Sequence, residues 1–221
     1  PGEISLAHNG VLFLDELPEF KRTVLEVMRQ PIEDRVITIS RAKFTVDYPA
    51  SFMLITSMNP CPCGYYNHPE KTCLCAPGMV QKYLNKISGP LLDRIDLHVE
   101  VTPVNFDELT NKNKGEKSQQ IRERVVKARD VQEQRFSENK KIHANSQMDT
   151  KQIQSYCKLD EESKKLLKTA MEKLDLSARA YDRILKVART ISDLDNTEDI
   201  NSAHIAEAIQ YRSLDRESWA G

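Results

Sequence analysis

The sequence contains no long apolar run and no excess of charge of one sign. No stretch approaches the roughly 20 consecutive apolar residues that a membrane-spanning helix needs, and no secretory signal pattern opens the chain. The 32 Lys and Arg residues are balanced by 33 Asp and Glu residues, which leaves a net charge of −1. Any contact with nucleic acid must therefore come from a loop or a local patch. We expect a cytoplasmic protein that makes no membrane contact.

Cysteine is scarce outside one short segment. Four of the five cysteines fall in that segment, and they are Cys61, Cys63, Cys73 and Cys75. This clustering favours a metal site or reduced structural thiols over disulfides. Four thiolates can close a tetrahedral zinc site and leave no open position for catalysis, although Cys-x-Cys is a less usual zinc spacing than Cys-x₂-Cys. His68 is an alternative ligand, and Cys157 stands alone and is expected to be packed.

Two adjacent carboxylates follow the apolar run Val11-Leu12-Phe13-Leu14. Such a run is typical of a parallel-sheet strand covered on both faces, and ligands gather at the carboxyl ends of these strands. Asp15 would hold Mg²⁺ there and Glu16 would polarise an attacking water. On its own the pattern also fits an ordinary strand end, so the rest of the chain must decide.

The first half of the chain has the signals of an α/β domain. The periodicity predicts a helix over 19–30 that ends at Pro31, because proline interrupts a helix interior. Residues 36–46 read as a β-hairpin with a basic tip, and 52–56 as a second buried strand that leads to Asn59. Further elements are expected at 77–86, a helix, and at 95–101, a strand with one covered face.

Beyond Pro103 the composition shifts to long helical patterns. We expect an exposed helix over 118–136, a polar linker over 137–148 and three helices at about 160–174, 178–194 and 202–211. Ser177 is the expected N-cap of one, and Asn201 or Ser202 of the last. The predicted domains are therefore an α/β part at 1–104 and a helical part at 105–221.

Four strings occur in the order found in AAA+ ATPases. They are Gly-Val-Leu-Phe-Leu-Asp-Glu-Leu from Gly10, Thr-Ser-Met-Asn-Pro from Thr56, Gly-Pro-Leu-Leu-Asp-Arg-Ile-Asp from Gly89 and Ser-Ala-Arg from Ser177. Over nearly its whole length the chain closely resembles the C-terminal part of the magnesium-chelatase-like AAA+ proteins of the ComM or YifB family. The resemblance implies a partial AAA+ core, with parallel strands, helices and a pre-sensor-1 hairpin, followed by an all-α lid.

The resemblance also implies roles for individual residues. Asp15 and Glu16 resemble the Walker B pair, and Asn59 resembles the sensor-1 residue that orients water against the γ-phosphate of ATP bound with Mg²⁺. Arg94 resembles the arginine finger offered to a neighbouring subunit, a role that suits a planar, always charged guanidinium. Arg179 resembles sensor 2. For both arginines the alternative is an ordinary surface or lid-packing ion pair.

The resemblance to ring helicases implies that the hairpin is the pre-sensor-1 hairpin and lies near the central pore. Arg41 and Lys43 could then contact DNA phosphates, and Phe44 could stack on a base. A charged tip is equally a normal way to protect an exposed turn.

One motif of such an ATPase is missing, because no Gly-rich loop ending Gly-Lys-Ser/Thr occurs in the sequence. In the family this phosphate-binding loop lies upstream, with a Lon-protease-like N-terminal domain, so we expect a fragment that is inactive alone. The intact protein would form a homo-hexameric ring and act as a DNA helicase or branch-migration factor in DNA uptake and recombination. The alternatives are a chelatase-type motor that remodels a protein partner and a zinc-stabilised scaffold without activity.

Overall fold

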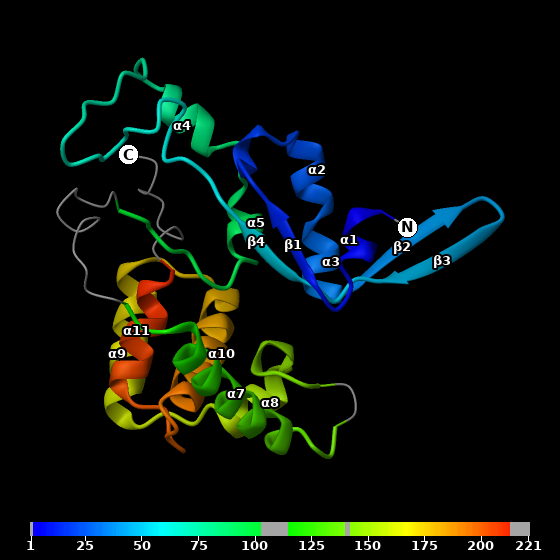
Figure 1. Ribbon diagram of the computed structural model, residues 1–221, viewed down its shortest axis with the longest axis vertical. Coiled ribbons are helices and arrows are strands. Elements are labelled where there is room, and N and C mark those ends of the chain that lie inside the picture. The colour runs from blue at the N-terminus through cyan, green and yellow to red at the C-terminus, as the bar shows by residue number, and fades with distance from the viewer. Residues whose placement is uncertain (1, 103–114, 140–141, 213–221) are drawn as a thin grey trace. The chain divides into compact units, whose positions relative to one another are not determined.

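The computed structural model describes residues 2–102, 115–139 and 142–212. It divides into two compact units, the first ending at Ile95 and the second starting at Asp96. The first is mixed α/β and the second is helical, which confirms the α/β class and the helical C-terminal region (Figure 1). The boundary expected between 104 and 105 lies outside the described residues. None of the described helices combines the length and apolar character needed to cross a membrane.

The first unit holds two small sheets. Its elements are α1 (Glu3–Leu6), β1 (Val11–Leu14), η1 (Leu17–Glu19), α2 (Arg22–Val27), α3 (Arg29–Asp34), β2 (Val36–Arg41), β3 (Phe44–Pro49), β4 (Met53–Thr56), α4 (Met79–Leu84) and α5 (Gly89–Leu92). β1 pairs in parallel with β4, and β2 pairs with β3 as an antiparallel hairpin. The four strands and the hairpin pairing were expected from the sequence, whereas the pairing of β1 with β4 comes from the structure.

The parallel pair brings two distant segments to one edge. Val11 lies opposite Met53, and Leu14 lies opposite Thr56. The pairing continues one residue further, because the Ser57 amide donates to the Leu14 carbonyl at 3.1 Å. The residues that follow β1 and β4 therefore begin at the same edge of the sheet.

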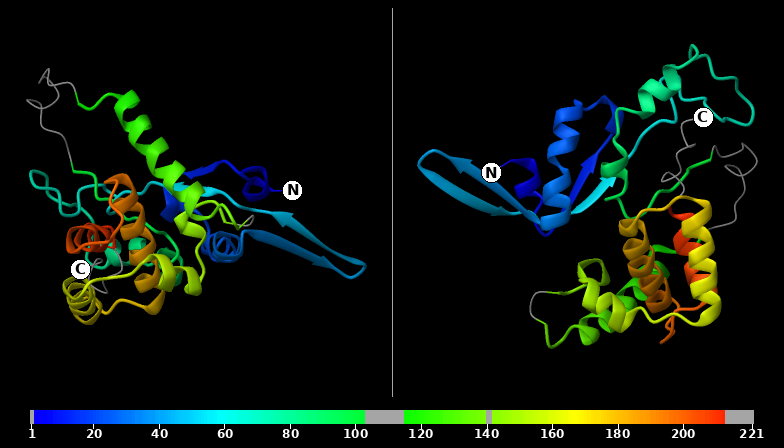
Figure 2. Two further views of the ribbon diagram at one scale, coloured as in Figure 1. Left: turned by 90° about the horizontal axis from the view of Figure 1, so that it is seen from below. Right: turned by 180° about the vertical axis from the view of Figure 1, so that it is seen from behind.

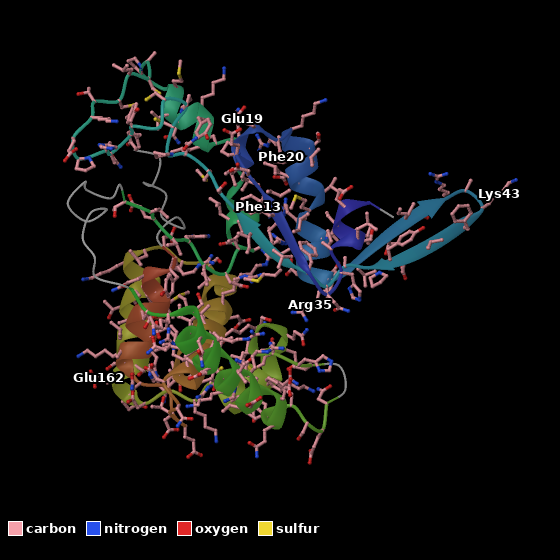
Figure 3. The ribbon with its side chains drawn as sticks, viewed as in Figure 1. Phe13, Glu19, Phe20, Arg35, Lys43 and Glu162 are labelled. Atoms are coloured by element: carbon pink, nitrogen blue, oxygen red, sulfur yellow. The ribbon has the colours of Figure 1, made fainter. Side chains whose placement is uncertain are left out.

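The expectation that β1 and β4 are buried on both faces is wrong for the described structure. Val11 and Phe13 are 56% and 59% exposed, and Met53 and Ile55, their partners in the register, are exposed as well. Figure 3 labels Phe13 on β1. The neighbours of these four residues along each strand are half-buried. A run of apolar residues predicts a strand, but burial depends on what covers each face of the sheet. No described element of this unit covers the face that carries these four side chains.

Pro31 does not end a helix, contrary to the sequence prediction. The expected single helix is two helices, α2 and α3, that meet at Met28, and Pro31 is the third residue of α3. The first-turn N–H groups of a helix have no acceptor within it, so proline is tolerated there. The new helix start at Arg29 is what makes room for Pro31.

The strand predicted over 95–101 is also wrong. No described residue pairs with it as a strand, and Leu97, Val99 and Val101 are exposed whereas His98 is buried. The His98 amide donates to the Tyr211 carbonyl at 2.8 Å instead. Alternation only says which residues share a face; a strand also needs a neighbour for its backbone groups.

The second unit is built around α10. Its elements are α7 (Ser118–Arg135), η2 (Asn145–Gln147), α8 (Thr150–Tyr156), α9 (Glu161–Lys173), α10 (Ala178–Leu194) and α11 (Ser202–Gln210). α10 contacts α7, η2, α8 and α11, and its apolar face forms the core with Ile205 and Ala208. Ser177 caps α10 and Asn201 caps α11, which confirms these helix starts.

Residues 137–148 are more than a polar linker, and α8 was not predicted. Asn145 is 1% exposed because its side chain binds Asp193 and Thr190, at 2.7 and 3.1 Å. Asp193 also accepts two bonds from Arg135, at 2.5 and 2.8 Å, and one from Arg189 at 3.2 Å. This buried network ties α7 and η2 to α10, and a carboxylate without such partners would not stay charged there.

Candidate functional site

Asp15 lies at the carboxyl end of β1 with its carboxylate held in place. One of its oxygens accepts hydrogen bonds from the Ser57 hydroxyl and from the Glu16 amide, the latter at 3.0 Å. Ser57 directly follows β4, so the second strand supplies a donor that orients the acid of the first. The residue is exposed and therefore accessible to a bound cation.

Glu16 has a left-handed backbone, with φ 52° and ψ 50°. A residue with a side chain rarely adopts this conformation, which costs on the order of 1–3 kcal/mol and is often found at functional sites. The next two residues hold the turn, because Leu17 and Pro18 are buried and the Leu17 amide donates to the Ser57 carbonyl at 3.0 Å. The turn keeps two adjacent exposed carboxylates at the edge where β1 and β4 end.

Asn59 is exposed and lies three residues beyond β4. Its backbone N–H donates to the hydroxyl oxygen of Tyr83 from α4. Tyr83 is 6% exposed and packs with Leu84, Met58 and Val80. Burial and the negative charge of Glu19 raise the pKa of Tyr83. The segment carrying Asn59 is thus fixed from the side of α4, although its sensor-1 role stays a prediction.

Arg94 is held within its own unit. Its side chain is 8% exposed, with Nε 2.8 Å and a terminal nitrogen 2.6 Å from Glu33 Oε2. The other terminal nitrogen donates to the Pro90 carbonyl at 2.6 Å. These contacts match the ion-pair alternative for Arg94. A finger role in a neighbouring subunit stays a prediction, and it requires the guanidinium to be released from these contacts.

Arg179 is the second residue of α10 and is exposed on the second unit. Its sensor-2 role stays a prediction.

The hairpin forms as predicted and extends past its expected end at residue 46. Cross-strand bonds join Thr38 to Asp47 at 2.7 Å and Ser40 to Thr45 at 3.1 Å. The hairpin projects away from the rest of the first unit (Figures 1 and 2), with Lys43 at its tip (Figure 3).

All three candidate DNA-contact residues are exposed at this tip. Arg41 and Phe44 are the last pair of the ladder, and Ala42 and Lys43 form the turn between them. Phe44 is 53% exposed, so its ring is accessible from solvent.

The four clustered cysteines come together in the loop that follows Asn59. Their sulfurs all lie within 4.8 Å of one another, and Cys61 is buried whereas the other three are half-buried. Three of the Sγ–Sγ distances are 3.4 Å for Cys61–Cys63, 3.5 Å for Cys63–Cys73 and 3.8 Å for Cys61–Cys73. Sequence spacing alone did not establish this proximity.

The thiols differ in acidity. Backbone N–H groups of Tyr65 and Leu74 lower the pKa of Cys63 to about 6. The pKa of Cys75 is raised to about 12: a backbone N–H of Cys63 lowers it, but burial and the neighbouring thiols outweigh that effect. A thiolate therefore forms readily at Cys63, whereas burial and the neighbouring thiols oppose the ionisation of Cys75.

His68 does not join this cluster. Its Nδ1 accepts the amides of Glu70 and Lys71, at 3.0 and 3.1 Å, and it is absent from the group of converging ligand atoms found among the described residues. The alternative in which His68 replaces a cysteine is therefore not supported by the geometry. Cys157 is buried in the second unit, as expected.

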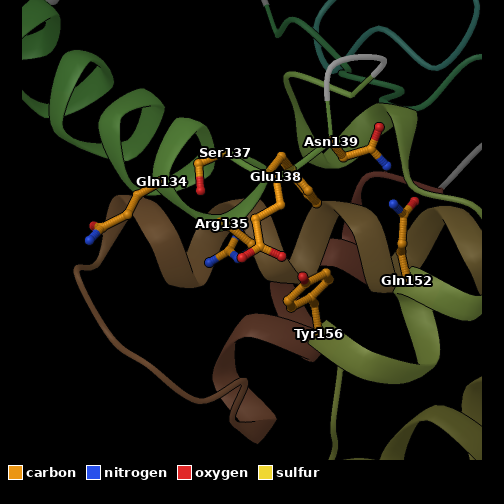
Figure 4. Close-up of a pocket in the computed structure, with 8 residues that line it drawn as sticks. Gln134, Arg135, Ser137, Glu138, Asn139, Gln152 and Tyr156 are labelled. Atoms are coloured by element: carbon orange, nitrogen blue, oxygen red, sulfur yellow. The ribbon is translucent and has the colours of Figure 1, made fainter.

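A hollow of about 630 Å³ lies in the second unit beside α7 and α8 (Figure 4). It is lined by Gln134, Arg135, Phe136, Ser137, Glu138, Asn139, Gln152 and Tyr156. None of the predicted site residues borders it, and the Arg135 guanidinium is already bound to Asp193. The hollow therefore has no part in the candidate chemistry.

Two family models match successive parts of the chain. The model for magnesium chelatase, subunit ChlI, matches residues 1–109, and the model for the C-terminal part of that subunit matches residues 115–212. The two matches divide the chain between its α/β part and its helical part.

Curated relatives match nearly the whole chain. It is 46% identical over 217 residues to the competence protein ComM of Haemophilus influenzae, and 45% identical over 220 residues to the uncharacterized protein YifB of Escherichia coli. An uncharacterized Mycobacterium bovis protein is 35% identical over 212 residues. These matches cover 96–98% of this chain and 41–42% of the relatives, so the chain spans about two fifths of their length. The chain belongs to the magnesium-chelatase-like family that includes ComM and YifB.

Proposed function

We propose that this chain is the Walker B, sensor and lid part of an AAA+ ATP-driven ring motor that acts on DNA. The observation that carries the proposal is the edge shared by β1 and β4. There Ser57 orients the Asp15 carboxylate, Glu16 is held beside it in a strained turn, and Asn59 follows the second strand.

ATP with Mg²⁺ fits the oxygen-rich end of these strands. Asp15 would hold the cation, directly or through water, because Mg²⁺ binds through carboxylates while retaining waters. Glu16 would position the water that attacks the γ-phosphate, and Asn59 would orient it. The bound magnesium would neutralise charge on the phosphates.

The hairpin supports DNA as the substrate. Its tip presents two cations and an aromatic ring to solvent, the combination that binds phosphates and stacks on bases. The relative from H. influenzae is named for competence, which fits a role in DNA uptake and recombination. We therefore infer a homo-hexameric helicase or branch-migration motor.

A second candidate is a motor that remodels a protein partner, as the match to a magnesium chelatase subunit suggests. It would use the same ATP chemistry with a different substrate in the ring. In either case, a metal held by the cysteine cluster would be structural, since four thiolates leave no position for a reacting water.

The experiment compares ATP turnover of the intact protein without DNA, with single-stranded DNA and with branched DNA, and follows strand separation in the same samples. Glu16→Gln is the control for contaminating ATPase activity. We expect DNA to stimulate turnover and strands to separate only when ATP is hydrolysed. If neither kind of DNA changes ATP turnover and no strands separate, the result would contradict the DNA motor and favour the protein-remodelling candidate.

A further inference from the structure

The segment between β4 and α4 has no regular secondary structure over residues 57–78. Of residues 61–79, Cys61 alone is buried, and Leu74 is 82% exposed. Irregular loops longer than about 12–15 residues are uncommon in compact domains unless something orders them. This loop has no apolar core of its own that could do so.

The cysteine sulfurs have the spacing of a tetrahedral metal site. A zinc ion bound at a Zn–S distance of about 2.3 Å places its sulfurs about 3.8 Å apart. The three measured separations are 3.4, 3.5 and 3.8 Å, and all four sulfurs lie within 4.8 Å. Soft thiolates select zinc over magnesium or calcium.

The backbone around the cysteines is shaped to bring them together. The Gly64 amide donates to the Cys61 carbonyl at 3.0 Å, and Gly64 has a φ of +81°, which favours glycine. This turn reverses the chain just after Cys63. Backbone N–H groups of Tyr65 and Leu74 then donate to the Cys63 sulfur.

We propose that Cys61, Cys63, Cys73 and Cys75 bind one zinc ion as a tetrathiolate that fixes the loop beginning two residues after Asn59. A structural zinc stabilises a fold that the apo chain cannot hold by itself. It supplies here the cross-link that the loop's exposed side chains cannot.

The zinc would also help to hold Asn59 in place. This part of the inference rests on the proposed function. The loop is closed at its base, where Tyr83 of α4 packs on Met58 and its hydroxyl oxygen accepts a hydrogen bond from the Asn59 amide. With Cys61 anchored by the metal, Asn59 is held from both sides. Zinc loss should leave it held from the α4 side only and so lower ATP turnover.

The direct test measures zinc and iron in the intact protein, purified in reducing buffer without chelator, by elemental analysis. The parent protein should carry a zinc ion that the double variant Cys63→Ser/Cys75→Ser loses. Cys157→Ser, which changes the buried cysteine of the other unit, should retain it. Absence of metal from the parent, zinc unchanged in the double variant, or iron in place of zinc would each overturn the proposal.

A second measurement uses the unaltered chain, because the variants can fail to fold. Zinc is displaced from the parent with a mercurial reagent and then restored with excess thiol and zinc, and trypsin cleavage after Lys71 is followed. Lys71 lies in this loop, with its ammonium 4.9 Å from the Tyr65 ring centroid. Cleavage should accelerate by about tenfold or more on zinc removal and slow again on restoration, as expected when local opening becomes easier by that factor. Equal rates would overturn the ordering role.

ATP turnover in the same samples separates the two parts of the inference. Turnover that falls with zinc removal and recovers on restoration supports the link to Asn59, and turnover that does not change overturns that link while the metal site stands. A parent that carries zinc but hydrolyses no ATP contradicts the proposed function alone.

Discussion

The Arg94 guanidinium binds the Glu33 carboxylate through two nitrogens, at 2.8 and 2.6 Å. Glu33 is the fifth residue of α3 and Arg94 follows α5, so the pair joins two helices that are distant in sequence. The Arg94 guanidinium is thus bound within its own chain. It can act as an arginine finger only if a neighbouring subunit displaces Glu33 from it when the ring assembles.

Replacing Arg94 with alanine in the intact protein should abolish ATP turnover, because a finger in trans contributes about 10³ to 10⁵ in rate in related chemistry. Rings mixed from Arg94→Ala and Glu16→Gln subunits should regain part of it, since each variant spoils a different element of a shared site. Turnover in mixed rings is the measurement.

The control is Glu33→Gln, which retains a hydrogen-bond acceptor and removes the intrachain charge. It should leave turnover measurable, whereas Arg94→Ala should not. If co-assembled mixed rings show no activity, or if Arg94→Ala turns over normally, Arg94 is only the structural partner of Glu33.

Replacing Arg41 and Lys43 with alanine should weaken DNA binding of the intact protein in a salt-dependent way. Two lost phosphate contacts should lower the slope of log affinity against log salt by roughly 1.4 to 1.8. Basal ATP turnover should persist, because neither residue lies at the β1–β4 edge. Lys82→Ala with Lys86→Ala, on and just after α4, is the matched charge control. If the slope of log affinity against log salt does not change, Arg41 and Lys43 make no phosphate contacts and the tip is only a solvated turn.

Replacing Asp193 with asparagine should destabilise the second unit by about 3–5 kcal/mol, the usual effect of removing one partner from a buried ion pair. Arg135 and Arg189 would remain buried next to a neutral group, and burial already lowers the pKa of Arg189. Denaturant unfolding measures the change. Asp130→Asn, on the exposed side of α7, should shift the unfolding free energy by less than about 0.5 kcal/mol. Equal effects of the two substitutions would contradict the structural role of Asp193.

Cys157 should make stability fall at alkaline pH. Burial raises the pKa of its thiol from 9.0 to about 11, and its sulfur donates to the Leu185 carbonyl at 3.7 Å. Because the folded value is the higher one, the stability that the protonated thiol contributes is complete below pH 9.0 and is lost as pH rises toward about 11.

The unfolding free energy of the parent should therefore fall more steeply across this window than that of Cys157→Ala. The cavity left by alanine costs the same at each pH and cancels in the comparison. A difference between the two proteins that stays constant over the window would show that Cys157 does not titrate as described.

Local signals in the sequence were sufficient for much of the fold. The hairpin, the strand that ends just before Asp15 and the caps at Ser177 and Asn201 were all predicted, because each depends on residues within a few positions of one another. The cysteine cluster was predicted from its spacing, but the distances between its sulfurs required the structure.

Features that depend on distant partners were not predictable. The Glu33–Arg94 pair spans 61 positions, and the burial of Asn145 depends on Asp193, 48 positions away. The lack of strand pairing by residues 95–101 within the described structure and the exposed face of β1 and β4 have the same cause, since periodicity does not specify which neighbour is present. A capping box at Asp149 and Gln152 was the local signal that could have revealed α8.

The central claim is that the edge shared by β1 and β4 hydrolyses ATP, and Glu16→Gln in the intact protein tests it most directly. Both nucleotide affinity and turnover are measured at saturating Mg²⁺ and ATP. We predict nearly unchanged affinity with turnover lowered by about 10² to 10⁴, as expected when the group that positions the attacking water loses its charge. Turnover close to that of the parent protein would contradict the assignment of Glu16 and, with it, the proposed function of this edge.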